Sequence, residues 1–167
     1  MEKIFAPWRM QYILSNSESE DKTPDGCIFC VFPKLSEDEK RLIIERGKSC
    51  FVIMNAYPYN PGHLMVVPYR HTSDFTSLTA EELAEAFALV QKSIKALNTL
   101  IQPHGFNIGV NLGRTAGAGI DQHLHIHIVP RWNGDTNFMP VTGETRVISE
   151  SLQSTYSRLT AIWKTIS

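Results

Sequence analysis

The sequence predicts an α+β domain in which an antiparallel sheet packs against one long helix and a C-terminal helix. Short runs rich in β-branched and aromatic residues are separated by turn-forming Pro, Gly and Asn. One long stretch repeats apolar residues at helical spacing, and a second such stretch lies near the end. Short strands joined by tight turns, with few helices, favour an antiparallel sheet.

The first two strands are predicted as a pair. Residues 50–54 and 63–68 are apolar and β-branched, and the segment 55–62 between them contains two prolines and a glycine. Two further strands are expected at residues 106–111 and 123–128.

The clearest helix is predicted over residues 79–101. Thr79, followed by Glu82 three positions later, forms a capping box that marks its start. Its apolar residues recur at spacings of four and three, as in an amphipathic helix. They are Leu83, Phe87, Val90, Ile94 and Leu97. A C-terminal helix is expected from about residue 146 to residue 165. Its apolar stripe is Leu152, Tyr156, Leu159 and Trp163.

The N-terminal part reads as a separate segment. Residues 4–14 could form a short helix, and the following residues up to 26 are rich in Ser, Glu and Asp, as in a linker. We therefore divide the chain into an N-terminal segment with its linker, residues 1–26, and one main domain, residues 27–167.

Composition argues against several classes of partner. The formal net charge of -1 gives no basis for binding a nucleic-acid polymer or a membrane surface. No apolar run approaches the roughly 18 residues of a membrane span, and the first residues lack a signal-peptide core. We therefore expect a cytoplasmic protein. Two of the three cysteines, Cys27 and Cys30, are two residues apart, which favours reduced thiols or a metal over a disulfide.

Three histidines, His123, His125 and His127, alternate along the fourth predicted strand. On a strand they share one face, about 6.6 Å apart and about 13 Å end to end. Such a row suits an extended anionic substrate, because a single metal ion could hardly use all three. In one reading the middle imidazole attacks phosphorus while its neighbours donate to phosphate oxygens or to the leaving oxygen. In another, a zinc-dependent hydrolase uses two of the histidines as ligands.

A glycine-rich segment, residues 113–120, precedes the histidine row. Its glycines allow the backbone to approach a ligand and direct N–H groups at phosphate oxygens, although such segments are often plain connectors. It is not a Walker loop, because no Gly-Lys-Ser/Thr follows. Its position directly before the histidines makes it a candidate phosphate-binding loop.

The histidine row and its surroundings resemble the histidine triad (HIT) superfamily. Residues 123–129 match the His-φ-His-φ-His-φ-φ signature, in which φ is apolar. Further matches in the family's order are Asn55, residues 61–63, Asn111 and residues 130–131. The strings 55–63 and 132–140 look like the bacterial diadenosine tetraphosphate phosphorylase branch. That branch resembles the fragile histidine triad hydrolases more than the small nucleoside phosphoramidases.

The resemblance implies a fold, an assembly and a reaction. The fold is HIT-like, and its sheet extends across a two-fold homodimer. The reaction is cleavage of a (di)nucleoside polyphosphate at the α-phosphorus, with phosphate or water as acceptor. His125 would be the nucleophile that forms a nucleotidyl-histidine intermediate. His123 and His127 would bind phosphate oxygens or assist the leaving group, and His63 would support the triad.

The resemblance also implies substrate contacts. Asn55 would hold the ribose and Asn111 would contact phosphate. Many family members carry a Ser or Thr shortly before the triad, but here Gly119 stands nearest, with an extra residue before the first histidine. Backbone N–H groups of the loop, with Gly117 and Gly119 as candidates, or Thr115 would have to replace that contact. By analogy, the walls of a purine slot would be Phe29, Phe51 and Ile53.

The spacing of Cys27 and Cys30 fits two zinc ligands, and the alternative is two small buried residues without a metal. The resemblance implies that His71 and His123 complete a closed, structural four-ligand site. A divalent cation could also accompany the nucleotide. The leading reading is therefore an enzyme acting on an adenosine-type nucleotide. The other readings are an AMP-binding regulatory protein with little turnover, against which the intact middle histidine argues, and a nucleoside phosphoramidase.

Overall fold

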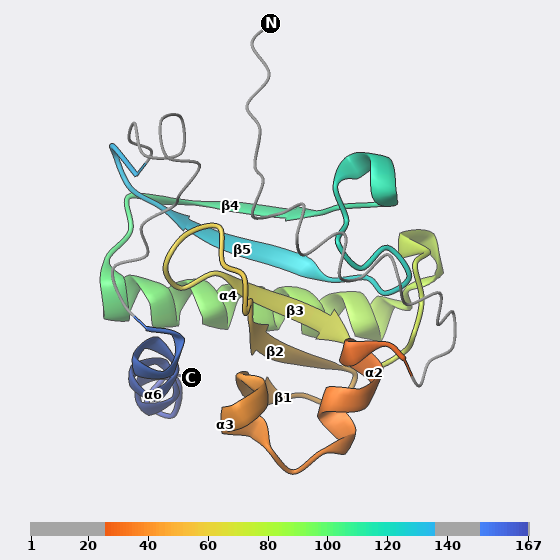
Figure 1. Ribbon diagram of the computed structural model, residues 1–167, viewed down its shortest axis with the longest axis horizontal. Coiled ribbons are helices and arrows are strands. Elements are labelled where there is room, and N and C mark those ends of the chain that lie inside the picture. Colours follow the sequence, from red (N-terminus) through yellow and green to blue (C-terminus); the bar gives the residue numbers. More distant parts are fainter. Residues whose placement is uncertain (1–25, 136–150, 167) are drawn as a thin grey trace, which may run out of the picture.

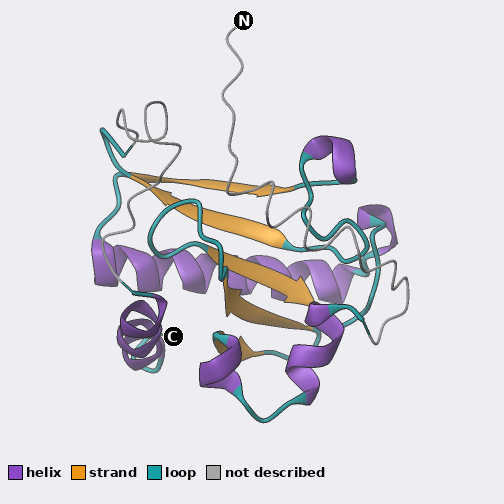
Figure 2. Cartoon of the chain, viewed as in Figure 1, coloured by secondary structure: helices purple, strands orange, loops and turns teal. Residues whose placement is uncertain are grey.

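The computed structural model describes residues 26–135 and 151–166. It shows a five-stranded antiparallel sheet with helices packed against it, which confirms the predicted α+β class (Figures 1 and 2). The strands lie in the order β1-β2-β3-β5-β4. They are β1 (Ile43–Arg46), β2 (Cys50–Met54), β3 (Leu64–Pro68), β4 (Gly105–Val110) and β5 (Ile126–Arg131). The helix expected over residues 4–14 lies outside the described residues.

Among the described residues, one helix is long, one is of medium length and two are short. They are α2 (Ile28–Val31), α3 (Asp38–Arg41), α4 (Ala80–Ile101) and α6 (Leu152–Trp163). Three 3-10 turns accompany them: η1 (Phe32–Lys34), η2 (Phe75–Ser77) and η3 (Arg114–Ala116). Within the described part of the chain, no helix is long and apolar enough to cross a membrane.

The alternation of side chains along the strands creates two cores, one on each face of the sheet. Buried residues of β2, β3 and β5 that point to one face pack against α4 and α6. The alternate residues of β2 and β3 point to the other face and form a smaller cluster with Phe29 of α2. Because both faces are covered, β2 and β3 are buried along their whole length. In β5, His127 alternates with the buried Ile126 and Ile128. It therefore points to the second face, where the site lies.

Helix α4 begins as predicted. The Thr79 hydroxyl accepts the N–H of Glu82 at 3.2 Å, and the Glu82 carboxylate accepts the N–H of Thr79 at 2.9 Å. The predicted apolar stripe is only partly correct, because Phe87 is 52% exposed while Val90 and Leu97 are buried. The buried stripe is rotated towards small residues, which allow the helix to approach the sheet closely. These small residues are Ala86, Ser93 and Ala96.

Three features differ from the sequence prediction. Strand β1 and the short helices α2 and α3 were not predicted, because each spans only four residues and carries little periodic signal. The histidine strand begins later than the predicted residue 123, since β5 starts at Ile126. The C-terminal helix is confirmed over Leu152–Trp163, and its predicted first residues, 146–150, lie outside the described residues.

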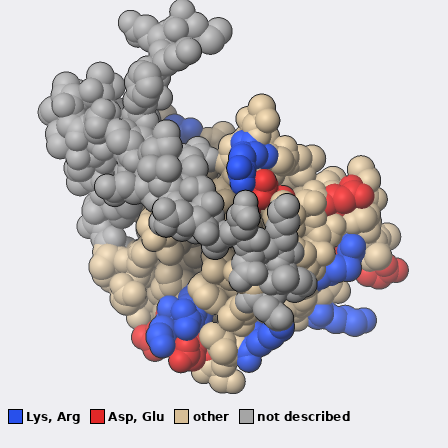
Figure 3. Space-filling model, turned by 45° about the vertical axis from the view of Figure 1, so that its right-hand side comes forward, with Lys and Arg blue, Asp and Glu red and all other residues tan. Residues whose placement is uncertain are grey.

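Opposite charges lie beside one another on the face shown in Figure 3, in keeping with the small net charge. One ion pair, between Arg46 and Asp38, also fixes the segment that precedes β1. Arg46 binds Asp38 at 2.6 Å and donates to the carbonyls of Pro33 (2.6 Å) and Leu35 (2.9 Å). The guanidinium therefore holds η1 and α3 against β1.

Candidate active site

The three histidines are buried at the start of β5, which lies between β3 and β4 in the sheet. His127 belongs to β5, whereas His125 and His123 precede it in a segment without regular secondary structure. The N–H of Leu124 donates to the carbonyl of Thr72 at 2.8 Å and fixes that segment. The three imidazoles therefore do not form one uniform row, and each has its own hydrogen-bond partners.

His125 is oriented by the main chain. Its Nδ1 lies 2.9 Å from the carbonyl oxygen of His123. A carbonyl can only accept, so Nδ1 carries the proton and Nε2 keeps a lone pair. Burial lowers the pKa of His125 below its ordinary value of 6.5, against an opposing effect of the His123 carbonyl. At neutral pH His125 is therefore a neutral imidazole with a nucleophilic nitrogen.

His127 is oriented by a second imidazole, that of His63. The N–H of Tyr59 donates to His63 Nδ1 at 3.1 Å, so the remaining proton of His63 is on Nε2. That Nε2 lies 3.0 Å from His127 Nδ1 and donates to it. His127 consequently carries its own proton on Nε2. Burial, with a smaller contribution from the neighbouring histidines, lowers the pKa of His63 to about 3, so His63 is neutral at physiological pH.

His125 and His127 border a cavity of about 260 Å³ on the second face of the sheet. Part of its wall is apolar and part carries hydrogen-bonding groups, a combination that can hold an aromatic ring beside an anionic group. The main apolar wall residues are Phe29, Phe32, Leu42, Ile53, Met65 and Ile120. Phe29 and Ile53 thus lie where the sequence placed them. Phe51 does not line the cavity, because it is fully buried against Tyr69, at 5.3 Å between ring centroids.

The predicted substrate-binding residues fall into two groups. Asn55 and Gly119 line the cavity together with His125 and His127. Asn111 and Gly117 lie outside its lining and contact each other, since Asn111 Nδ2 donates to the Gly117 carbonyl at 3.4 Å. Gly117 has a φ of 90°, which a residue with a side chain rarely adopts. In this structure these two residues shape the loop that carries Gly119.

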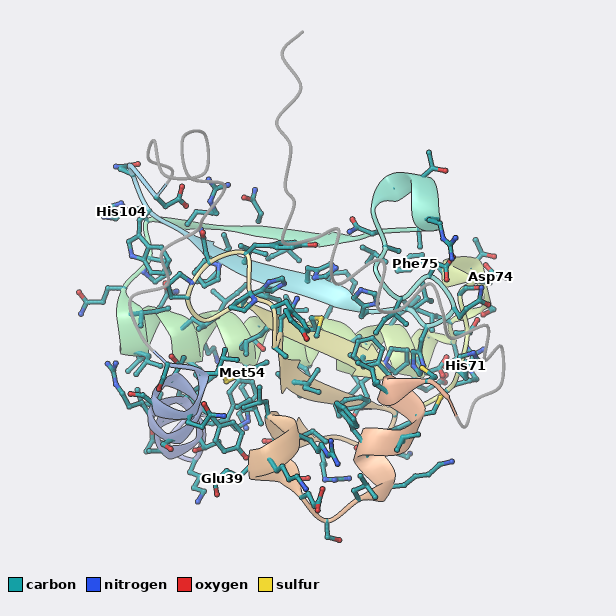
Figure 4. The ribbon with its side chains drawn as sticks, viewed as in Figure 1. Glu39, Met54, His71, Asp74, Phe75 and His104 are labelled. Atoms are coloured by element: carbon teal, nitrogen blue, oxygen red, sulfur yellow. The ribbon has the colours of Figure 1, made fainter. Side chains whose placement is uncertain are left out.

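The predicted metal ligands meet at one end of the sheet. Atoms of Cys27, Cys30, His71 and His123 that could bind a metal all lie within 4.8 Å of one another. The Nδ1 atoms of His71 and His123 are 3.3 Å apart. His123 Nδ1 is also 3.4 Å from Cys27 Sγ and 3.6 Å from Cys30 Sγ. Figure 4 shows His71 beside α2, which begins directly after Cys27. Ligands around a tetrahedral zinc ion are separated by about 3.3 to 3.8 Å, so the donor set fits zinc.

His123 is oriented as a ligand of this cluster. Its Nε2 lies 2.8 Å from the carbonyl of Pro68 and donates to it, so Nδ1 presents its lone pair to the cysteines. A hydrogen bond from the distal nitrogen of a ligand histidine to a carbonyl is the usual outer support of a zinc site. Both ring nitrogens of His123 are thus engaged away from the cavity, whereas His125 and His127 line it.

The sequence did not predict two features of the site: the ring contacts of Phe29 with the histidines, and the part that residues 41–42 play in the cavity wall. Phe29, between the two cysteines, touches the rings of both His123 (5.5 Å between centroids) and His125 (5.3 Å). Leu42 and Arg41, at the end of α3, also line the cavity and were not predicted. No periodic signal marks Arg41 and Leu42, because α3 spans only four residues. Phe29 was predicted as a cavity wall, but its contacts with two triad histidines were not.

Comparison with known proteins agrees with this geometry. Residues 36–134 match the family model of the HIT domain. The chain belongs to the HIT domain family. A protein of Mycobacterium tuberculosis called AP-4-A phosphorylase is 42% identical over 170 residues, which cover 98% of this chain and 85% of the relative.

Solved HIT structures also share the fold. A Zn-bound histidine triad family protein from Mycobacterium smegmatis superposes with a TM-score of 0.68 at 26% identity, covering 86% of this chain and 96% of that one. A HIT family member from Bacillus subtilis reaches a TM-score of 0.59 at 27% identity, covering 65% and 75% of the two chains.

The metal cluster yields a direct prediction. The purified protein should carry about one zinc per chain, and chelation should lower its melting temperature, because the ligands join α2 to the triad segment. Cys30→Ser should lose the zinc, whereas Cys50→Ser should keep it, since Cys50 is buried in β2 and is not one of the four clustered ligands. Elemental analysis and thermal unfolding measure both. The zinc site would be refuted if the purified protein contained no metal and its melting temperature did not change when a chelator is added.

Proposed function

We propose that the protein cleaves dinucleoside polyphosphates such as diadenosine tetraphosphate at the α-phosphorus, through a nucleotidyl-histidine intermediate on His125. One observation carries this proposal. The hydrogen bond from His125 Nδ1 to the His123 carbonyl leaves the Nε2 lone pair available on a residue that lines the cavity. A neutral, buried imidazole held in one tautomer is suited to attack phosphorus.

The reaction would run in two displacements. The Nε2 lone pair of His125 attacks the α-phosphorus, a P–N bond forms, and the P–O bond to the leaving nucleotide breaks. His127 Nε2–H donates to the leaving oxygen or to a non-bridging oxygen beside it. Phosphate or water then attacks the same phosphorus and breaks the P–N bond. From diadenosine tetraphosphate this releases ATP first, then ADP if phosphate is the acceptor or AMP if it is water.

The remaining residues support this assignment. The apolar wall would hold the base, Asn55 would hold the ribose, and the backbone at Gly119 would approach the phosphates. We assign His63 to orienting His127, and we assign His123 to the metal rather than to phosphate. A divalent cation would accompany the substrate phosphates. The relative called AP-4-A phosphorylase, at 42% identity over nearly the whole chain, favours a dinucleoside polyphosphate over a phosphoramidate as substrate.

A zinc-dependent hydrolase is less well supported. The cluster takes only His123 from the triad, and its four protein ligands leave no open position for a reacting water. We therefore propose a structural zinc that joins residues 27–30 to the domain. This also supports a main domain that starts at residue 27.

The nucleophile can be tested by substitution and by product analysis. His125→Ala should abolish turnover of diadenosine tetraphosphate while nucleotide binding largely survives, because the other donors and the apolar wall remain. Products should be identified with and without inorganic phosphate: ADP plus ATP indicates phosphorolysis, and AMP plus ATP indicates hydrolysis. Turnover of His125→Ala within about tenfold of the parent would contradict the assignment.

The lowered pKa of His125 predicts the pH dependence of the first displacement. Protonation would remove the attacking lone pair, so activity is lost as pH falls through the pKa of His125. Because burial lowers that pKa, ATP release in a single turnover should stay constant down to a pH below 6.5. Diadenosine tetraphosphate has no terminal phosphate that titrates in this range. A decline that is half complete at or above pH 6.5 would contradict this account of His125.

The two edges of the sheet differ, which supports a homodimer through β4. At the β1 edge, α6 packs against the strand, and the Tyr156 hydroxyl donates to the Ile43 carbonyl at 3.0 Å. At the β4 edge, Ile108 is 45% exposed and Leu112 is 51% exposed. Among the described residues no strand pairs with the outer side of β4. An edge strand with exposed apolar side chains is a surface that pairing with a second copy would cover.

Light scattering of the purified chain should therefore give about twice the chain mass of 18.9 kDa at micromolar concentration. Ile108→Lys should shift it towards the monomer, because a buried lysine would oppose pairing of the edges. As a control, Tyr57→Lys replaces another exposed apolar residue away from this edge, and the dimer should persist. A monomeric parent protein would refute the dimer.

A further inference from the structure

One buried polar cluster lies outside the cavity and beside the triad strand. Its centre is the carboxylate of Asp135, whose side chain is only 9% exposed. Both of its oxygens bind Arg131, at 2.5 Å to Nε and 2.9 Å to Nη2. The N–H of Trp132 donates to it at 3.2 Å. The Arg131 guanidinium holds the pKa of Asp135 well below its usual range, so the carboxylate is charged under all relevant conditions.

A fourth hydrogen bond connects this carboxylate to a distant loop. Asn60 is buried, and its Nδ2 donates both hydrogens, one to Asp135 at 2.8 Å and one to the Pro130 carbonyl at 2.9 Å. Pro130 belongs to β5, the strand that carries His127. The amide therefore fastens the loop between β2 and β3 to the strand of the triad and to the turn that follows it.

The same loop contacts His63, because Tyr59 and Asn55 both donate to its Nδ1, at 3.1 Å and 3.4 Å. The residue before Asn60 is Tyr59, whose N–H donates to His63 Nδ1 at 3.1 Å. The carbonyl of Asn60 accepts the N–H of His63 at 3.2 Å. If the loop shifted, the Tyr59 N–H would leave Nδ1, and that nitrogen could take the proton instead. His63 Nε2 would then become an acceptor, and His127 would place its proton on Nδ1 and lose the Nε2–H donor.

We propose that Asp135 and Asn60 are positioning residues for the reaction: they hold the Tyr59 N–H on His63 and thereby fix the tautomer in which His127 donates from Nε2. A carboxylate is required at position 135, because its oxygens accept from Arg131, Trp132 and Asn60 together. An amide at this position would turn one acceptor into a donor that faces other donors. The inference rests on the proposed function for its consequence in catalysis, but the tautomer itself can be measured independently.

The test compares Asp135→Asn and Asn60→Ala with the control Asn107→Ala in the full-length protein. The control removes a different hydrogen bond of the same cluster, from Arg131 Nη1 to Asn107 Oδ1 at 2.7 Å, and leaves the loop fastened. Nitrogen-15 spectra of the imidazoles report the tautomers. His63 and His127 should both be Nε2-protonated in the parent and the control, and should become mixtures in the two test variants.

Catalysis should follow the tautomer. The kcat for diadenosine tetraphosphate should fall about tenfold or more in Asp135→Asn and Asn60→Ala, with KM changed less than about threefold, because the donor is misplaced while the cavity walls remain. Asn107→Ala should retain the parent's kcat within about twofold.

Several outcomes would overturn the inference. Unchanged tautomers in a folded Asp135→Asn or Asn60→Ala protein would do so, even if the melting temperature falls, since that fall alone indicates a merely structural role. If the parent shows no turnover, the proposed function fails, and the spectra still decide the positioning role. If Asp135→Asn does not fold, Asn60→Ala carries the test, because it leaves the Arg131–Asp135 pair in place.

Discussion

The proposed active site depends on one hydrogen bond, from His125 Nδ1 to the main-chain carbonyl of His123. It converts a residue that could protonate either nitrogen into one with a defined lone pair. Because the acceptor is a carbonyl, it cannot itself change protonation, so the tautomer of His125 does not depend on pH. A main-chain carbonyl also orients His123. The Pro68 carbonyl accepts the hydrogen bond from His123 Nε2, so the Nδ1 lone pair faces Cys27 and Cys30.

The sheet explains why these carbonyls and imidazoles keep their places. Strand β5 is paired on both sides, with β3 and with β4, and His127 takes its place from this internal strand. The alternation of side chains sends Ile126 and Ile128 into the core against α4 and leaves His127 on the opposite face. Small residues of α4 allow that core to close tightly. The site is therefore built on the buried sheet, while residues of the shorter elements α2 and α3 complete the cavity wall.

The sequence was sufficient where a pattern repeats. The capping box of α4 and the β2–β3 pair both have periodic or positional signals, and the four metal-ligand candidates do come together. It was insufficient where contacts are long-range. The commitment of His123 to the cluster depends on the Pro68 carbonyl, 55 residues away. The exposure of Phe87 depends on which face of α4 meets the sheet, and four-residue helices carry no period to read.

The central claim is that His125 becomes covalently nucleotidylated. The most direct measurement is intact-mass spectrometry of the protein quenched in base during turnover of diadenosine tetraphosphate without added phosphate, followed by peptide mapping. We expect a mass increase of one adenylyl group on the peptide containing residues 123–128. That group should be stable to base and lost in acid, as a phosphoramidate is, and absent from His125→Ala. Turnover by the parent with no adduct in any quench, or an adduct on another residue, would contradict the account.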